Sequence, residues 1–503
     1  MSQHRRWHRY LAVILALTGL SASSSGCRVT ARHDFSDPPV AVPDRFRSPE
    51  SSDAAPVPLE WWAAFGDDEL DHLVRESLER NIDLRVAWDR LRQSVAEARI
   101  AGAALLPQVD VNGGASLTRT VQHGGTTATF PGARVRRDES DDQYFVGLGL
   151  GYEVDLWGRI AAQRSAATLR AQATREDAEA TALLVSGRIT DLWLTVIEQR
   201  ALRRLVLEQI ETNRRFLELT ELRLSLGEGS ALDVMQQRQQ TAATQSELPV
   251  VESALEAAVL QLEVLLGRPP TQRLVLTASA FPDLPPWPEL PAPAELCGRR
   301  PDLRAALRRL EATDEEVAAA VADRLPRLAI SLDYDLSAPH LGRLFEREVT
   351  SLIGNFVAPL IDGGRRRAEV ERRQSLVQQS LGAFAQSFLD ALLEVESAIA
   401  RERHQRVLID RLREQVDLAR QTVEESRSRY SNGLDSFLSV LTALQSLQQV
   451  ERRFVTESRR LLTIRAELYR ALGGGGWTRA LEPSAPRELR EIELPERPEE
   501  PTP

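Results

Sequence analysis

The sequence contains the same series of motifs twice, in the same order and at nearly constant spacing. Asp83-Leu84-Arg85 recurs as Asp302-Leu303-Arg304, 219 residues further along the chain. A Gly-Arg pair at 158–159 recurs at 364–365, and the pattern Arg-x3-Gly-x2-Ser-x-Leu at 223–232 recurs at 429–438, both 206 residues apart. Chance likeness between generic helices does not keep such offsets across several motifs. The chain is therefore predicted to consist of two tandem copies of one structural unit.

Each copy is predicted to contain the same elements. It begins with a helical stretch, at 67–104 and again at 302–323. After a proline the apolar residues alternate, which predicts strands with one apolar face. The alternating residues are Val146, Leu148, Leu150, Tyr152 and Val154 in the first copy and Leu328, Ile330, Leu332, Tyr334 and Leu336 in the second. Polar, Gly-containing loops are expected around Thr118–Asp142 and Ser337–Arg347, and 13 extra residues of the first copy fall in this part of it.

Long helices follow the strands in both copies. No proline occurs from Gly158 to Gly227 or from Gly364 to Gly433, two intervals of 69 residues each. In the second interval the apolar stripe is typical of a coiled coil; it includes Phe384, Phe388, Leu392, Val395 and Ile399. At 1.5 Å per residue such a helix is roughly 100 Å long, which is too long to fit within a compact globular domain. The Gly-x2-Ser motif then ends the helix, and a second helix returns at 232–266 and at 438–471.

Four strands with one apolar face are too few to form a closed barrel within one chain. A length of roughly 9–11 residues suits a tilted strand that spans a membrane. Four strands cannot close into a barrel, and open strand edges are not tolerated in lipid. The strands are therefore predicted to be completed by other copies of the chain. The alternative is a soluble periplasmic protein whose strands form a small sheet packed beneath the helices.

The N-terminus has the pattern of a signal peptide over residues 1–26. Arg5, Arg6 and Arg9 are basic, Leu11–Leu20 is apolar but too short for a stable anchor, and Cys27 follows a small polar stretch. A cysteine directly after Ser-Gly resembles a bacterial lipoprotein processing site, which predicts a covalent lipid on Cys27 and a lipid-anchored extended segment at 27–60. The alternative is cleavage nearby, with Cys27 an ordinary residue.

Composition excludes several classes of protein. All 63 basic residues are arginine and the net charge is -10, whereas a nucleic-acid binder would usually carry a basic surplus. Two cysteines exclude a disulfide framework, and Cys297 is expected to be a buried or half-buried structural thiol. The seven histidines show no metal-ligand spacing, and Gly147-x-Gly149-x-Gly151 lies within a strand rather than before a helix. No catalytic or metal site is predicted, and the chain is not expected to be an enzyme.

Several motifs together resemble one known family, the outer membrane factors, which are TolC- and OprM-like efflux ducts, in the lipoprotein branch often labelled NodT. The resemblance covers roughly residues 55–478, and its strength lies in the ordered set. The motifs are Trp61-Trp62-x2-Phe65-Gly66-Asp67-x2-Leu70, Asn81-x-Asp83-Leu84, Asp155-Leu156-Trp157-Gly158-Arg159, Arg299-Arg300-Pro301-Asp302-Leu303, Pro359-Leu360-Ile361-Asp362-Gly363-Gly364-Arg365 and Leu472-Gly473-Gly474-Gly475-Gly476-Trp477.

The resemblance implies a mainly α-helical protomer that trimerises. Twelve strands, four per chain, would form a β-barrel in the outer membrane, and the helices would continue it as a periplasmic α-helical barrel. The trimer would be a passive exit duct, with a periplasmic adaptor and an RND-type inner-membrane pump as partners. An exit duct for type I protein secretion and a non-channel, lipid-anchored periplasmic scaffold stay open as alternatives.

Segment boundaries follow from the repeat and its flanks. The first repeat is predicted at 61–280, a Pro-rich link at 281–293 and the second repeat at 294–476. A Pro- and Glu-rich tail at 477–503 is predicted to be disordered.

The two Gly-x2-Ser turns are the candidate functional site. Glycine permits the positive φ of such a turn, and a serine there can cap the returning helix. By resemblance these turns form the periplasmic tip where the adaptor docks; the candidate residues are Arg223, Gly227, Ser230, Leu232, Asp233, Arg429, Gly433 and Ser436.

The same turns are where the resemblance places the narrowest part of the duct. The candidate constriction residues are Tyr430, Asp435, Leu438 and Thr442. Tyr430 is expected to bond to Asp233 across adjacent helices. Thr442 stands where family members often carry aspartate, which puts a ring of carboxylates at that level in question. The alternative for each residue is simple helix packing.

Overall fold

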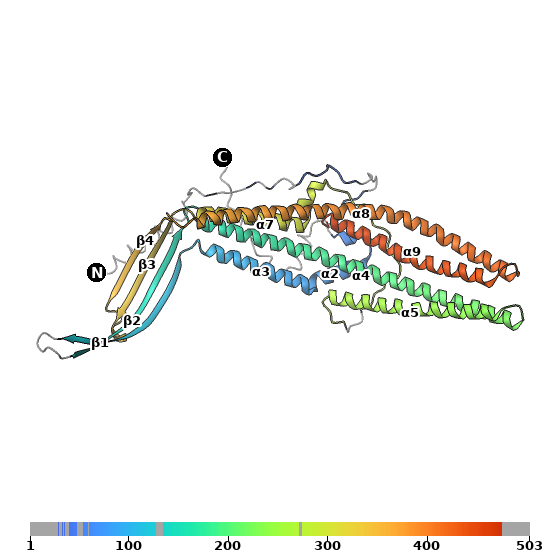
Figure 1. Cartoon of the computed structure of the whole chain (residues 1–503), viewed down its shortest axis with the longest axis horizontal. Coiled ribbons are helices and arrows are strands. Elements are labelled where there is room, and N and C mark those ends of the chain that lie inside the picture. Colours follow the sequence, from blue (N-terminus) through green and yellow to red (C-terminus); the bar gives the residue numbers. More distant parts are fainter. Residues whose placement is uncertain are drawn as a thin grey trace. The chain divides into compact units, whose positions relative to one another are not determined.

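The computed structural model describes residues 29, 33, 35, 40–47, 54–58, 60–126, 134–270 and 274–474. The predicted signal peptide, Cys27 and the tail at 477–503 lie outside these residues. The described part is mainly helical with one small sheet (Figure 1).

Apart from the short η3, the order of elements is the same in both halves of the described chain, as the repeated motifs predict. The first half has η1 (Trp61–Phe65), α2 (Asp68–Arg80), α3 (Ile82–Ala103), β1 (Gln108–Thr126), β2 (Arg134–Val154), α4 (Arg159–Ser225) and α5 (Ala231–Leu265). The second half has η2 (Pro293–Glu295), α6 (Leu296–Arg299), α7 (Pro301–Ala322), β3 (Arg327–Ala338), η3 (Leu341–Arg343), β4 (Glu348–Val357), α8 (Arg365–Ser431) and α9 (Phe437–Ala471). The long helices α4 and α8 both have 67 residues, and the return helices α5 and α9 both have 35.

The chain divides into two compact units, and neither coincides with one of the sequence repeats. Unit 1 combines Gln93–Ala171 with Arg309–Leu381. Unit 2 combines Phe35–Arg92, Gln172–Arg308 and the chain from Gly382 onward. Each unit therefore draws on both halves, and the four helices α3, α4, α7 and α8 contribute to both units.

Unit 1 contains a four-stranded antiparallel sheet in the order β1-β2-β3-β4, so that β1 and β4 form its edges. Cross-strand partners share a face of a sheet. One face carries apolar rows, such as the row that runs from Val109 on β1 to Leu352 on β4 through residues 150 and 332. The opposite face carries Asp110 and Asp333 on either side of Gly149. The predicted alternation is confirmed.

The first hairpin is longer than predicted, and the loop expected around Thr118–Asp142 is wrong. The β1–β2 ladder continues from Leu117↔Asp142 out to Thr126↔Arg134, whereas β2 pairs with β3 only as far as Tyr144. Strands β1 and β2 therefore have 19 and 21 residues. The backbone ladder continues through this two-stranded extension, although its sequence lacks the apolar alternation that marks a strand.

Helix α4 is long and apolar enough in one 18-residue window to cross a membrane, by length and composition only. Of that window, 61% is buried inside the protein. A core helix has the same property, so the window by itself does not indicate a membrane span.

Unit 2 buries an ion pair that also holds the Pro-rich link. Arg465 on α9 and Glu402 on α8 are both fully buried, with Arg465 Nε 2.9 Å from Glu402 Oε2. The same guanidinium donates to the carbonyl oxygens of Pro285 and Pro286 and lies 5.1 Å from the centre of the Trp287 ring. Because buried charges are stable only when paired and hydrogen-bonded, this contact fixes the link to both helices.

Glu179, a second buried carboxylate of unit 2, shares the guanidinium of Arg304 with Glu176. Arg304 contacts both Glu176, at 2.7 Å, and Glu179. Burial and the charge of Glu176 raise the pKa of Glu179 to about 7, against the opposing effect of Arg304. Glu179 therefore titrates near neutral pH.

Cys297 on α6 is a free, half-buried thiol. Burial raises its pKa, which disfavours the reactive thiolate. The sequence expectation of a half-buried thiol is met.

Candidate functional site

The two Gly-x2-Ser turns have the same backbone structure, and both lie in unit 2. In the α4–α5 turn Gly227 has φ +77°, and its N–H donates to the Leu224 carbonyl at 3.1 Å. In the α8–α9 turn Gly433 has φ +74°, and its N–H donates to the Tyr430 carbonyl at 3.1 Å. The next N–H in each turn donates to the carbonyl of Arg223 or Arg429, both at 2.9 Å. These bonds satisfy the last carbonyls of the helix, and the positive φ favours glycine at both positions.

The starts of the two return helices differ. Ser230 caps α5: its hydroxyl accepts from the Leu232 N–H at 3.1 Å, and Asp233 accepts from the Ser230 N–H at 3.3 Å. Ser436 stands at the corresponding position of α9, but its side chain makes no capping bond. The expectation that both serines cap is therefore correct for Ser230 and wrong for Ser436.

Asp435 takes over the anchoring role in the second turn. Its carboxylate accepts from the Ser436 N–H at 2.8 Å and from the Ser439 hydroxyl at 2.9 Å, and Arg429 Nε lies 3.7 Å away. These hydrogen bonds, together with Arg429, hold the pKa of Asp435 below its usual range. Asp435 is therefore an ionised, exposed carboxylate at the turn.

Tyr430 meets Arg223 rather than Asp233. The Arg223 guanidinium lies 4.4 Å from the Tyr430 ring centre, and its Nη1 donates to the Tyr430 carbonyl at 3.0 Å. Among the described residues the buried Tyr430 hydroxyl has no hydrogen-bond partner, while Asp233 is engaged in the cap of α5. The expected Tyr430–Asp233 bond is wrong because the serine cap holds the aspartate within its own turn.

Tyr430 also belongs to an apolar cluster that sequence reasoning missed. Its ring packs against Phe437 at 5.5 Å between centres. The cluster joins α4, α8 and α9; its other members are Phe216, Val440, Leu441 and Leu444. Phe437 directly follows the Ser436 motif position, so an aromatic residue after the motif was the available signal.

Leucines are exposed around both turns. Leu232 and Leu438 occupy corresponding repeat positions, and both are exposed. Leu226 and Leu434, which belong to no repeated motif position, are exposed within the turns themselves. Thr442 is one helical turn beyond Leu438 and donates its hydroxyl to the Leu438 carbonyl at 2.8 Å. The turns therefore present apolar side chains to the surface, with arginine and carboxylate groups beside them.

Behind the turns, polar side chains link the two helical hairpins. Asn213 on α4 and Gln237 on α5 are fully buried, and Gln237 Nε2 donates to the Asn213 carbonyl at 2.8 Å. Gln240 on α5 exchanges hydrogen bonds with α9, accepting from Gln445 at 2.7 Å and donating to Gln448 at 3.1 Å. Polar residues buried between helices are candidates for fixing the register of the packing. Sequence patterns do not distinguish them from surface glutamines.

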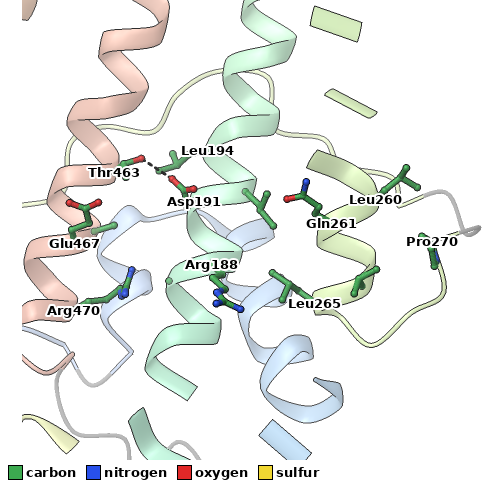
Figure 2. Close-up of a pocket in the computed structure, with 14 residues that line it drawn as sticks. Arg188, Asp191, Leu194, Leu260, Gln261, Leu265, Pro270, Thr463, Glu467 and Arg470 are labelled. Atoms are coloured by element: carbon green, nitrogen blue, oxygen red, sulfur yellow. Dashed lines mark hydrogen bonds between the residues drawn. The ribbon is translucent and has the colours of Figure 1, made fainter. Parts of the chain in front are cut away.

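A cleft of about 700 Å³ lies between α4, α5 and α9 in unit 2 (Figure 2). Asp191 accepts from Arg459 at 3.0 Å and from Thr463 at 3.2 Å on one wall. Arg470 lies over Gly187, where an added Cβ would come within 2.6 Å of its Cδ. Leu260, Val264 and Leu265 from α5 contribute to the opposite wall. The cleft combines apolar and charged walls, and no sequence motif predicted it.

Within the described residues, no group of three or more His, Cys, Asp or Glu side chains could hold a metal ion. The candidate turns present exposed leucines beside arginine and carboxylate groups, a surface that suits contact with another protein or with a passing solute.

Comparisons with known proteins agree on one family. A model of the outer membrane efflux protein family matches residues 73–268 and 292–474. The pyoverdine export outer membrane protein OpmQ of Pseudomonas putida is 32% identical over 446 residues, which cover 87% of this chain and 92% of OpmQ. The outer membrane protein OprJ of Pseudomonas aeruginosa is 28% identical, covering 92% of this chain and 95% of OprJ. The solved structure of the outer-membrane channel OprN superposes with a TM-score of 0.76 at 25% identity, covering 87% of this chain and 99% of that chain.

Proposed function

This chain belongs to the outer membrane efflux protein family, and from that premise we propose that it forms a passive trimeric exit duct for small molecules. The observation that carries the proposal is the four-stranded sheet with one apolar face and two open edges, β1 and β4. An apolar face suits lipid, and open edges in lipid must be paired. Three copies supply twelve strands, and pairing of β4 with β1 of the next copy closes the barrel.

The helices then continue the duct into the periplasm, and the two turns at 227–230 and 433–436 form its tip. The exposed Leu232 and Leu438 beside charged groups suit docking of a periplasmic adaptor. An inner-membrane pump of the RND type supplies the energy, and no bond is broken in this chain. A relative named for pyoverdine export supports small molecules as the cargo.

We assign the narrowest point of the tip to the second turn. Leu438 is exposed one helical turn from Thr442, and Asp435 supplies an ionised carboxylate in the same turn. The stacked Arg223 and Tyr430 hold the two hairpins together beside it.

A lipid on Cys27 is part of the proposal, and it anchors the chain to the outer membrane. Labelling with radioactive palmitate tests it: the parent protein incorporates label and the Cys27→Ala variant does not. Label in the Cys27→Ala variant would place the lipid elsewhere.

Two measurements on the purified full-length protein test the duct. We expect a trimer band in unheated SDS gels that becomes a monomer band on heating, and stepwise ion conductance in planar bilayers. A lipid-anchored scaffold without a channel gives no conductance. Absence of both the trimer and the conductance would refute the proposal that the chain forms a duct.

A further inference from the structure

The turn between β4 and α8 exposes two apolar side chains directly before a run of arginines. Leu360 is 91% exposed and Ile361 is 95% exposed, the highest values among the large apolar residues that the structure describes. Three arginines, Arg365, Arg366 and Arg367, form the first turn of α8. Water is an unfavourable environment for such a pair of side chains, so the turn has the properties of a binding surface.

The corresponding turn of the first repeat, between β2 and α4, is closed by its own contacts. Trp157 donates its indole N–H to the Pro326 carbonyl at 2.7 Å. Arg159, which corresponds to Arg365 in the repeat, lies 2.8 Å from Glu153 and is 18% exposed. The open turn is therefore a property of the second repeat and does not follow from the shared architecture.

The open turn continues the apolar face of the sheet. Phe356, the second-last residue of β4, pairs with Leu328 and is exposed, as is Leu352 earlier on the same face of β4. Leu360 and Ile361 follow four and five residues after Phe356. Exposed apolar residues thus continue along the chain from the end of β4 to the start of α8.

The three arginines divide into one that is structural and two that are available. Arg366 is 22% exposed and is held by Asp323 at 3.1 Å and Asp362 at 3.2 Å. Arg367 is 80% exposed and pairs along its own helix with Glu371 at 3.1 Å. Arg365 is exposed, and no ion pair or side-chain hydrogen bond joins it to the described residues.

Apolar side chains followed by cationic ones match the boundary between acyl chains and headgroups. Arginine matches phosphate geometry well, and basic residues gain affinity at an anionic lipid surface. A protein partner would also suit the apolar pair, but the continuity with the apolar strand face favours lipid.

We propose that the turn Leu360–Arg367 binds an anionic glycerophospholipid, with Leu360 and Ile361 among the acyl chains and Arg365 and Arg367 at the headgroup phosphate. The proposal rests on the proposed function, because it requires the apolar face of the sheet to lie in a bilayer. It assigns to the second repeat a lipid site that the first repeat lacks.

Native mass spectrometry of the detergent-purified full-length protein tests the site. Phosphatidylglycerol is titrated in, with phosphatidylcholine of the same chains as the neutral comparison. Removing two cationic contacts through Arg365→Gln with Arg367→Gln should weaken phosphatidylglycerol binding about 30-fold, at about 1 kcal/mol per arginine. Phosphatidylcholine binding should be unchanged. Leu360→Ser with Ile361→Ser should weaken binding of both lipids.

The matched control is Arg411→Gln with Arg413→Gln, two exposed arginines on the same helix that pair locally with Glu414 and Asp410. This control should bind phosphatidylglycerol like the parent. A second measurement needs no variant: phosphatidylglycerol binding to the parent should fall as salt rises, because exposed charge pairs are screened.

Three results would overturn the site. Equal phosphatidylglycerol binding by the parent and the Arg365/Arg367 variant is one, and binding by the parent that does not change with salt is another. The third is a variant of this turn that binds phosphatidylglycerol like the parent but no longer forms a trimer. That result would mean that the turn contacts a neighbouring copy of the chain. A parent protein that shows neither the trimer nor conductance refutes the duct instead, so the two failures are distinguishable.

Discussion

Replacing Arg465 by methionine should destabilise unit 2 strongly, because Arg465 and Glu402 are both fully buried. The change removes the buried partner of the Glu402 carboxylate and leaves only the half-exposed Arg406, 2.9 Å away, as its counter-charge. It also removes the guanidinium that donates to the carbonyl oxygens of Pro285 and Pro286. Breaking a buried pair from one side typically costs about 3–5 kcal/mol. That corresponds to a loss of at least about a hundredfold in the folding equilibrium. The link that carries these prolines should loosen from α8 and α9 as a result.

Urea unfolding of the detergent-solubilised protein, followed by far-ultraviolet circular dichroism, measures the effect. Arg411→Met is the matched control, because Arg411 on α8 pairs with Glu414 at 2.9 Å and is exposed. Exposed pairs contribute about 0–1 kcal/mol, so the control should scarcely move the unfolding midpoint.

The double variant Arg465→Met with Glu402→Gln separates a stranded charge from lost packing. Without a buried carboxylate that has lost its buried partner, it should recover a large part of the lost stability. An Arg465→Met variant as stable as the Arg411→Met control would refute the reasoning. A double variant less stable than the single one would show that the stranded charge is not the cause.

Three further predictions concern the pH response and the two turns. The pKa of Glu179 is about 7 in the folded protein, above the usual 4.5, so its contribution to stability is present below pH 4.5 and is lost as pH rises through 7. The free energy of unfolding should therefore fall between pH 5 and pH 8 by roughly 2–3 kcal/mol more in the parent than in Glu179→Gln, and equal changes would contradict the assignment. Ser230→Ala should lower stability by about 1 kcal/mol in thermal unfolding and Ser436→Ala by much less, since Ser230 alone caps its helix; equal losses would argue against this difference. Arg223→Met should raise single-channel conductance by freeing Tyr430, whereas Tyr430→Phe should leave it unchanged because the hydroxyl has no partner among the described residues; the reverse order would restore a role for that hydroxyl.

The fold was predictable wherever apolar residues carry a period. Alternation marks β3 and the paired part of β2, and the absence of proline marks α4 and α8. The extension of the first hairpin gave no such signal, because its ladder is formed by backbone groups that polar residues supply as well as apolar ones. Periodicity therefore indicates strands with one apolar face and gives no signal for a strand whose residues are polar.

The candidate site was predictable in its backbone and not in its side-chain contacts. Gly227 and Gly433 were identified because a positive φ selects glycine. The partner of Tyr430 was not identified. Arg223 and Asp233 both flank the α4–α5 turn, and only the packing of the helices decides which of them meets Tyr430. Buried charges such as Arg465 look like surface residues in a sequence that is rich in arginine.

The matched lengths of the helices restrict how this chain can change. Inserting one residue into α4 turns everything after it by about 100° and advances it by about 1.5 Å, so the α4–α5 turn would lose its alignment with the α8–α9 turn. An insertion there would be tolerated only together with a compensating change in α5 or in the α8–α9 hairpin, so two mutations would be needed. The first β-hairpin has no such constraint, and the 13 residues by which the repeats differ fall between Pro107 and Gly158, the part of the first repeat that contains it. We therefore expect natural length variation among close relatives to concentrate in the hairpins and to spare the long helices.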